Sequence, residues 1–186
     1  MSLLYIVRHS IPATDPSVAA ERWPLSDAGI RAAQQLGELS CWQDVEIIYS
    51  SPEPKALQTA EEIARQWGTR VIIEGGLREL QMKPVWLESA DFIKKVGDYL
   101  EGADDPDFEP YDQAQRRIVD CVQRLTQSHP DRSIAVVSHA RILVAFLSHL
   151  FGRRLGRQEW RSIKMPDLAV VDLAGSCVVS GFPKQD

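Results

Sequence analysis

The chain of 186 residues is 44% hydrophobic and 25% charged, a composition typical of a soluble globular protein with room for one well-buried core. Its formal net charge of −5 excludes the basic footprint by which proteins generally bind nucleic acid or membrane surfaces. The three cysteines are widely spaced without a C-x-x-C pair, which excludes a disulfide framework and a zinc site and fits a reducing compartment. No cationic leader precedes the first apolar run. We therefore expect one cytoplasmic domain over residues 1–186, a monomer or small homo-oligomer with no nucleic-acid or membrane partner.

The first predicted strand, residues 3–7, consists of five apolar residues without alternation. Such a run is typical of a strand that is buried on both faces of a parallel sheet. Arg8, His9 and Ser10 follow it directly, and Pro12 discourages any continuation of the strand. Because open α/β sheets bind ligands at the carboxyl ends of their strands, this placement predicts a cation and an imidazole in a binding site.

A loop and a helix separate the first strand from the second. Residues 10–24 contain three prolines and are predicted to form a loop over the sheet edge. Ser26 is expected to cap the helix that follows. The buried face of this helix should consist of Ile30, Ala33, Leu36, Gly37 and Leu39. The second strand is expected at residues 45–49.

A second helix is predicted to begin directly after that strand. Ser51 would be its cap and Pro52 its first residue, because serine and proline favour these positions at a helix start. Its expected buried face consists of Ala56, Ala60, Ile63, Ala64 and Trp67. The free amides and the dipole of a helix N-terminus attract anions, and Lys55 in the first turn would add a full positive charge.

The middle of the chain is predicted to alternate short elements with loops. A third short strand at residues 70–74 is followed by a glycine turn and by Glu79. Residues 91–100 are expected to form a helix, and residues 102–110 an acidic, proline-broken loop. Helical spacing of apolar residues predicts a long helix at residues 111–128.

A second strand with a histidine at its end repeats the arrangement of the first. Residues 133–138 are followed by His139, so both imidazoles should meet at one edge of one sheet. An apolar helix comes next, and a hairpin is expected to close the chain over residues 168–179. The basic stretch 153–164 is interpreted as a solvated face rather than a recognition patch for anions.

Taken together, these pieces resemble the histidine phosphatase superfamily, the phosphoglycerate-mutase-like phosphohydrolases. The matching pieces occur in the order of the family: Arg8-His9, Leu25-Ser26-Asp27-Ala28-Gly29, Ser50-Ser51-Pro52 with Ala56 and Gln58-Thr59-Ala60, Glu79 after Leu77, and Val137-Ser138-His139. The resemblance implies a three-layer α/β/α fold with a mostly parallel central sheet flanked by helices. It also implies that residues 81–110, the least family-like part, are an insertion that shapes the substrate pocket.

Phosphoryl transfer requires a nucleophile, donors for the phosphoryl oxygens and an acid for the leaving group. His9 could attack phosphorus through an unprotonated ring nitrogen, while Arg8 would bind the phosphoryl oxygens and disfavour the imidazolium form of His9. His139 would donate to a phosphoryl oxygen, and Glu79 is the candidate proton donor to the leaving group. The resemblance implies the same roles for these four residues and places Lys55 on the substrate phosphate.

Four departures from the family pattern concern the site. Ser10 replaces the usual glycine after the first histidine, and it either fits the turn or adds a hydroxyl donor for the phosphate. Lys55 replaces the usual arginine, so a compact ammonium charge replaces a planar guanidinium group. Arg141 stands close after the second histidine, where small residues are common, and it either extends into the phosphate pocket or faces solvent. The tryptophan-glutamate-glycine signature of many members is absent after Glu79.

We expect an enzyme, a metal-independent phosphatase that hydrolyses a phosphomonoester or a phosphohistidine through a phosphohistidine intermediate on His9. No cofactor is expected, since the sequence has no P-loop, no G-x-G-x-x-G stretch and no carboxylate cluster spaced for magnesium. The partner would be a small phosphorylated substrate or a phosphoprotein. Two alternatives stay open: a phosphoglycerate-type mutase, and a catalytically weak module that binds phosphorylated ligands.

Overall fold

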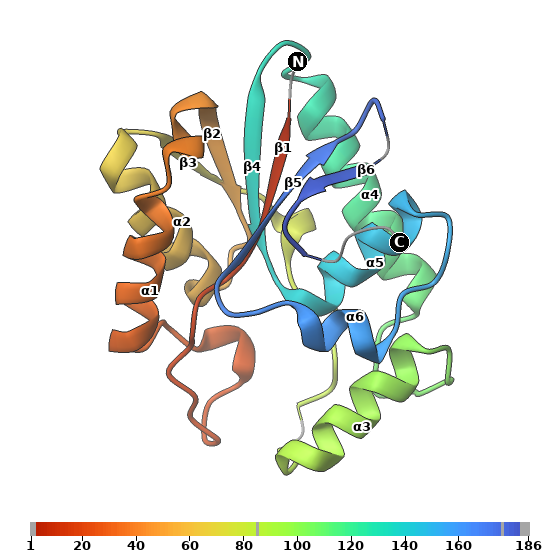
Figure 1. The fold of residues 1–186 in the computed structure, drawn as a ribbon. Helices are drawn as coiled ribbons and strands as arrows, with labels where there is room; N and C mark the ends of the chain where they lie inside the picture. The colour runs from red at the N-terminus through yellow and green to blue at the C-terminus, as the bar shows by residue number, and fades with distance from the viewer. Residues whose placement is uncertain (1–2, 85, 176, 183–186) are drawn as a thin grey trace.

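The computed structural model describes residues 3–84, 86–175 and 177–182, and within them shows a six-stranded sheet with helices on both faces (Figure 1). The strands follow the order β3-β2-β4-β1-β5-β6, in which the first four are parallel and the last two are antiparallel to their neighbours. Their bounds are β1 Leu4–Arg8, β2 Val45–Ser50, β3 Arg70–Ile73, β4 Ser133–Ser138, β5 Asp167–Asp172 and β6 Cys177–Ser180. The predicted mostly parallel sheet and the closing hairpin are confirmed.

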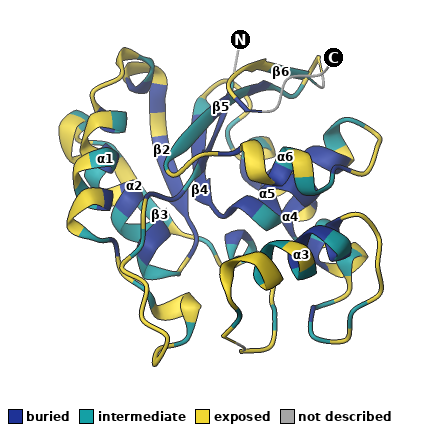
Figure 2. Ribbon diagram, turned by 60° about the horizontal axis from the view of Figure 1, so that its bottom comes forward, coloured by how far each residue is buried: buried dark blue, intermediate teal, exposed yellow. Residues whose placement is uncertain are grey.

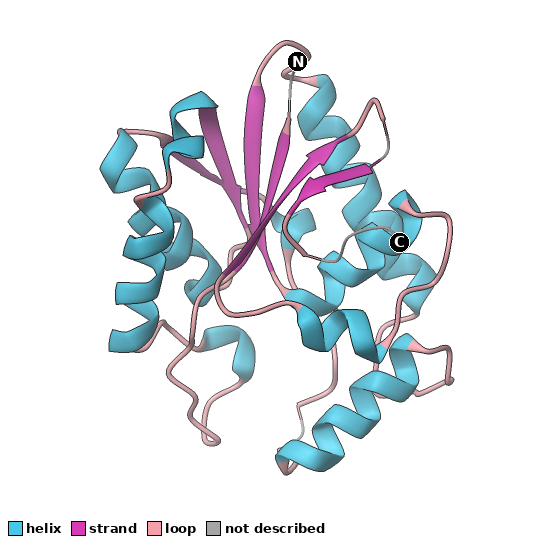
Figure 3. Ribbon diagram, viewed as in Figure 1, coloured by secondary structure: helices cyan, strands magenta, loops and turns pink. Residues whose placement is uncertain are grey.

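The helices form the two outer layers of a three-layer α/β/α fold (Figure 3). Their bounds are α1 Asp27–Gly37, α2 Pro54–Trp67, α3 Ser89–Leu100, α4 Tyr111–Gln127, α5 Ala140–Leu150 and α6 Arg157–Ser162, with short 3₁₀ turns at η1 Ala20–Arg22, η2 Ser40–Asp44 and η3 Gly75–Leu77. One face of the sheet is covered by α1 and α2, and the other by α4 and α5. Near the carboxyl edge of the sheet, α3 packs against α6. None of the helices described is both long and apolar enough to cross a bilayer.

The central strands are buried on both faces, which explains their unbroken apolar sequences (Figure 2). In β1, Leu4 and Ile6 belong to the core under α4 and α5, whereas Tyr5 and Val7 belong to the core under α1 and α2. Strand β4 alternates in the same way. The two strands that end at the predicted histidines are therefore the rigid centre of the molecule.

Helix α1 begins as predicted but ends earlier than its apolar residues suggest. The Ser26 hydroxyl accepts a hydrogen bond from the Gly29 N–H at 3.1 Å, which confirms the predicted cap. A side chain at Gly29 would collide with the Ile11 carbonyl, so glycine is required where the loop crosses the helix. Leu39 lies beyond Gly37, the last residue of the helix, and is exposed, so its place on the buried face was wrong.

Helix α2 begins later than predicted, and Ser51 is not its cap. The Ser51 N–H donates to Val137 O at 3.0 Å and so continues the sheet pattern for one more residue. Pro54 rather than Pro52 takes the first helical position, with Glu53 at the cap position. The predicted buried face is confirmed for Ala56, Ala60, Ile63 and Ala64, and Trp67 is half-buried.

The basic stretch after α5 is largely exposed, as the predicted solvated face requires, and two of its arginines also hold α3 in place. The Arg154 guanidinium donates to Tyr99 O and Leu100 O and lies 3.9 Å from the centre of the Tyr111 ring. Arg157 pairs with Asp98 at 2.5 Å. These contacts fix α3, the helix within residues 81–110.

Candidate active site

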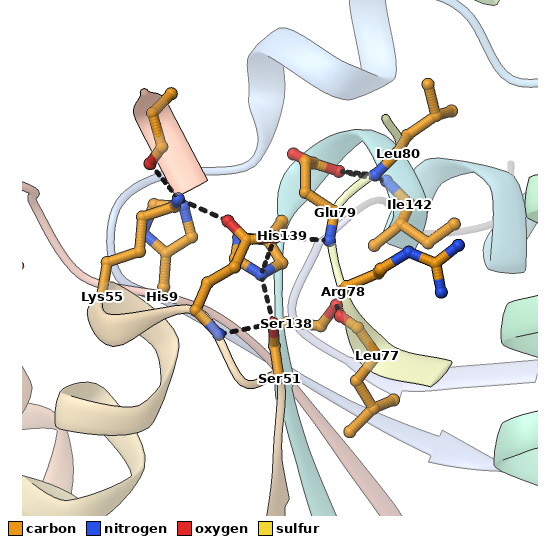
Figure 4. A network of polar contacts seen from close by, with 12 residues as sticks. His9, Ser51, Lys55, Leu77, Arg78, Glu79, Leu80, Ser138, His139 and Ile142 are labelled. Carbon is orange, nitrogen blue, oxygen red and sulfur yellow. Dashed lines mark hydrogen bonds and ion pairs between the residues drawn. The ribbon is translucent and has the colours of Figure 1, made fainter. Parts of the chain in front are cut away.

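The candidate active site lies at the carboxyl edge of the sheet, where β1 and β4 end side by side. Arg8 pairs with Ser138 in the strand register, and the His9 N–H donates to Ser138 O at 2.9 Å. His9 and His139 each follow their strand directly, and the centroids of their rings are 5.0 Å apart. The structure thus brings the two histidines together, as the sequence predicted (Figure 4).

The ring of His9 is held in one tautomer. Its Nδ1 lies 2.7 Å from the Ser10 carbonyl oxygen. Because a carbonyl oxygen can only accept, Nδ1 carries the proton and Nε2 is left with a free lone pair. Burial lowers the pKa of His9 to about 3, and the charges of Lys55 and Arg8 act in the same direction. The ring is therefore neutral and nucleophilic at physiological pH.

The ring of His139 is fully buried and contacts Ser51 and Glu53, which lead into helix α2. Its Nε2 lies 2.8 Å from the Ser51 hydroxyl and 3.4 Å from Glu53 Oε1. Its Nδ1 is buried without a hydrogen-bond partner among the described residues. Burial, followed by the nearby His9 ring and Lys55, lowers the pKa of His139 well below its usual value. His139 is thus a second neutral imidazole with one nitrogen available for a ligand.

The two predicted phosphate-binding cations lie in different surroundings. Arg8 donates to the Ile163 carbonyl, while its buried Nε has no partner among the described residues; burial lowers the pKa of its guanidinium. Lys55 is a buried lysine rather than an exposed one, and its Nζ lies 2.6 Å from Glu53 Oε2 and 2.8 Å from Ala20 O. Two of the three ammonium protons of Lys55 therefore already have partners within the chain.

Glu79 and Arg141 form a pair at the rim of the site. Glu79 Oε1 accepts from the N–H groups of Leu80 and Ile142 at 2.9 and 3.0 Å, and Glu79 Oε2 lies 3.2 Å from Arg141 Nε. Burial alone would raise the pKa of Glu79, but Arg141 and these amides outweigh it, so the pKa is lowered. Glu79 is consequently ionised, and Arg141 faces this carboxylate rather than open solvent.

The Ser10 hydroxyl is committed to the fold. It donates to Gly29 O at 2.7 Å, and the Ser10 N–H donates to the Thr59 hydroxyl at 2.9 Å. Ser10 is fully buried between α1 and α2. This geometry corresponds to the alternative in which serine fits the turn, and it does not support the prediction of Ser10 as a phosphate donor.

Sequence reasoning missed the carboxylate of Glu53, which lies among the predicted ligands. Besides its contacts with Lys55 and His139, Glu53 Oε1 accepts the Glu79 N–H at 2.8 Å. The only signal for Glu53 in the sequence was its position two residues before Lys55. With the start of the helix predicted at Ser51, Glu53 would have lain inside the first turn of that helix. Among the described residues, no three His, Cys, Asp or Glu side chains gather closely enough to hold a metal ion.

Two neutral imidazoles with an arginine and a lysine, at the carboxyl edge of a mostly parallel sheet, are the groups of a phosphoryl-transfer site on an α/β fold. The family model of the histidine phosphatase superfamily (branch 1) matches residues 4–177, so the chain belongs to this superfamily. This confirms the predicted family and the predicted class of enzyme, a phosphatase. A search of curated proteins finds no match.

Solved structures of similar fold include several phosphatases. The phosphoserine phosphatase of Entamoeba histolytica, in complex with 3-phosphoglyceric acid, has a TM-score of 0.79 at 18% identity, covering 100% of this chain and 98% of that chain. A mycobacterial glucosyl-3-phosphoglycerate phosphatase in complex with VO3 has a TM-score of 0.74 at 19% identity, with coverages of 92% and 91%. YhfR of Bacillus stearothermophilus has a TM-score of 0.74 at 19% identity, with coverages of 100% and 98%. These likenesses confirm the fold.

Proposed function

We propose that this chain is a metal-independent phosphatase that hydrolyses a phosphomonoester, or a phosphohistidine, through a phosphohistidine on Nε2 of His9. The observation that carries the proposal is the 2.7 Å contact between His9 Nδ1 and Ser10 O, which leaves the Nε2 lone pair free. A pKa of about 3 keeps that lone pair unprotonated across the physiological range. Such a nitrogen is a competent nucleophile toward phosphorus.

In the first step of the proposed reaction, His9 Nε2 forms a bond to phosphorus while the bond from phosphorus to the leaving oxygen breaks. Charge on the phosphoryl oxygens would be stabilised by Arg8, by the third ammonium proton of Lys55 and by His139. A hydroxyl can donate as well as accept, so Ser51 at 2.8 Å can hold His139 in the tautomer whose Nδ1 carries a proton for a phosphoryl oxygen.

Glu79 would move the protons in both steps. Protonated Glu79 gives its proton to the leaving oxygen in the first step. In the second step its carboxylate takes a proton from the attacking water, the bond between phosphorus and His9 breaks, and inorganic phosphate leaves. Because Arg141 and two amides hold Glu79 ionised, the enzyme must take up a proton before the first step. Mildly acidic solution should therefore favour formation of the phosphohistidine.

The substrate, in this proposal, is a small phosphorylated molecule or a phosphoprotein whose leaving group contacts residues 81–110. Met82, at the start of this segment, has its sulfur 3.9 Å from Arg141 Nη1 and so reaches the rim of the site. Trp86 is 57% exposed, which leaves most of an indole ring free to contact a leaving group. These two side chains support the role of the segment in shaping the pocket.

Hydrolysis measurements test this function directly. Wild-type protein should hydrolyse a generic aryl phosphate and at least one member of a panel of phosphorylated metabolites, with or without a strong chelator. His9→Ala should abolish this activity, whereas His149→Ala should not change it, because His149 is an exposed residue on α5. Loss of rate with chelator that magnesium or zinc restores would contradict metal independence. Binding of phosphorylated ligands without turnover would instead support the catalytically weak binding module, which the Lys55–Glu53 contact also favours.

A further inference from the structure

Glu53 places a carboxylate of the chain among the groups that would bind the phosphoryl group. The side chain is 11% exposed and accepts from two donors, Lys55 Nζ at 2.6 Å and the Glu79 N–H at 2.8 Å, while Nε2 of His139 lies 3.4 Å from Glu53 Oε1. Lys55, His139 and Glu79, which are labelled in Figure 4, belong to three different segments of the chain. One of these donors, Lys55, is proposed above to bind the phosphoryl group of the substrate.

This carboxylate has no other structural task in its own helix. Glu53 occupies the cap position of α2, yet its side chain makes no capping hydrogen bond. The following residue, Pro54, has no N–H to offer. The carboxylate is instead directed toward Lys55 and His139. Helix formation therefore does not explain why a charged oxygen is kept in a poorly hydrated place.

A phosphoryl oxygen and this carboxylate would compete for the Lys55 ammonium. The shortest contact of the Lys55 ammonium is to Glu53, so a phosphate group would have to share or take over that contact. Two anions held close together in a poorly hydrated site also repel each other strongly. We propose that Glu53 is a specificity-determining residue, an internal competitor that occupies the Lys55 ammonium and so weakens binding of the phosphate dianion there.

This inference, which rests on the proposed phosphatase function, has a consequence for the ligands that the site accepts. Inorganic phosphate has no other group with which to offset the competition, so it should bind weakly and leave readily after hydrolysis. A substrate has a leaving group whose contacts can compensate for the weakened phosphate contacts. The site should therefore favour phosphomonoesters with substantial leaving groups over bare phosphate and its analogues.

Titration of phosphate and vanadate into wild type and Glu53→Gln, followed by calorimetry, tests the competition without any need for turnover. Glutamine keeps the shape and one acceptor oxygen but removes the charge. We expect Glu53→Gln to bind both anions about tenfold more tightly or better, as is typical when a like charge is removed from a binding site. Phosphate should also raise the melting temperature of Glu53→Gln more than that of wild type, because binding would restore a partner to Lys55.

Two further variants make the result specific. Glu61→Gln removes the same charge from the same helix at an exposed residue that makes no hydrogen bond or ion pair within the described part of the chain, so its phosphate affinity should equal that of wild type. The double variant Glu53→Gln/Lys55→Ala should lose the gain, because the competition acts through Lys55.

Unchanged or weaker phosphate binding by Glu53→Gln would overturn the inference and make Glu53 a residue that positions Lys55. If Glu53→Gln folds poorly, the same titration is carried out with Glu53→Ala. Unchanged or weaker phosphate binding by that variant would likewise overturn the inference. A wild type that hydrolyses no phosphoester, while Glu53→Gln still gains phosphate affinity, would contradict the proposed function and leave the competition in place.

Discussion

Replacing Lys55 by methionine removes the ammonium but keeps an apolar stem of similar length. In wild type, Nζ lies 2.6 Å from Glu53 Oε2, and the two side chains are only 8% and 11% exposed. Removing one partner of such a buried pair typically costs about 3–5 kcal/mol, because the other charge stays buried without compensation. In a protein of this size, about 1 kcal/mol lowers the melting temperature by roughly 2–4 °C. Lys55→Met should therefore melt about 6–20 °C below wild type.

Scanning calorimetry measures this shift, and the double variant Lys55→Met/Glu53→Gln separates stability from catalysis. Removing both charges leaves neither unpaired, so the double variant should regain most of the lost stability. Activity should not return with it. Loss of a donor to the phosphoryl oxygens typically costs about a hundredfold in rate or somewhat more, and the double variant lacks this donor too.

Two results would refute this reasoning in different ways. If the melting temperature of Lys55→Met equals that of wild type, Lys55 and Glu53 do not form a buried ion pair in solution. If the double variant recovers activity together with stability, Lys55 supports the fold near the site but does not act on the phosphoryl group.

The remaining predictions concern protons and hydrogen-bond partners. Phosphoenzyme formation should stay fast as the pH falls from neutral to roughly 5, because burial lowers the pKa of His9 from the ordinary value near 6.5 to about 3; rapid-quench rates that fall with a midpoint near the ordinary value would contradict this. Arg141→Gln should raise the pKa of Glu79, since Arg141 lowers it, and so shift the alkaline limb of the pH–rate profile to higher pH. An unmoved limb would remove Glu79 as the proton donor. Ser10→Ala should lower the free energy of unfolding by about 1–3 kcal/mol, because Gly29 O loses its buried donor, and should leave phosphate affinity unchanged. Weaker phosphate binding at unchanged stability would make Ser10 a phosphate ligand after all.

The sequence was sufficient to predict which strands and which helix carry the main residues of the site. An unbroken apolar run followed by polar residues indicates a central strand and its end, so the positions of His9 and His139 at one sheet edge followed from local pattern alone. The same reasoning located the helix that carries Lys55. These features depend on residues adjacent in sequence, and the structure confirms their placement.

The contacts made by the polar side chains could not be predicted in the same way. Whether Arg141 faced the pocket or solvent depended on Glu79, which is far away in sequence and reaches the start of α5 through a loop. The start of α2 was misplaced because Ser51 and Pro52 suit a helix start locally, while the sheet binds the Ser51 N–H. That shift of two residues put Glu53 at the cap position, and with it the carboxylate that no periodic pattern marks.

Trapping the phosphorylated protein tests the central claim most directly. Wild-type protein mixed with substrate labelled in its phosphoryl group, and quenched within the first turnover, should carry label that is acid-labile and base-stable. Peptide mapping should place that label on His9, and His149→Ala should give the same result. Label on a serine or an aspartate, or label that persists in His9→Ala, would contradict a phosphohistidine mechanism at this site.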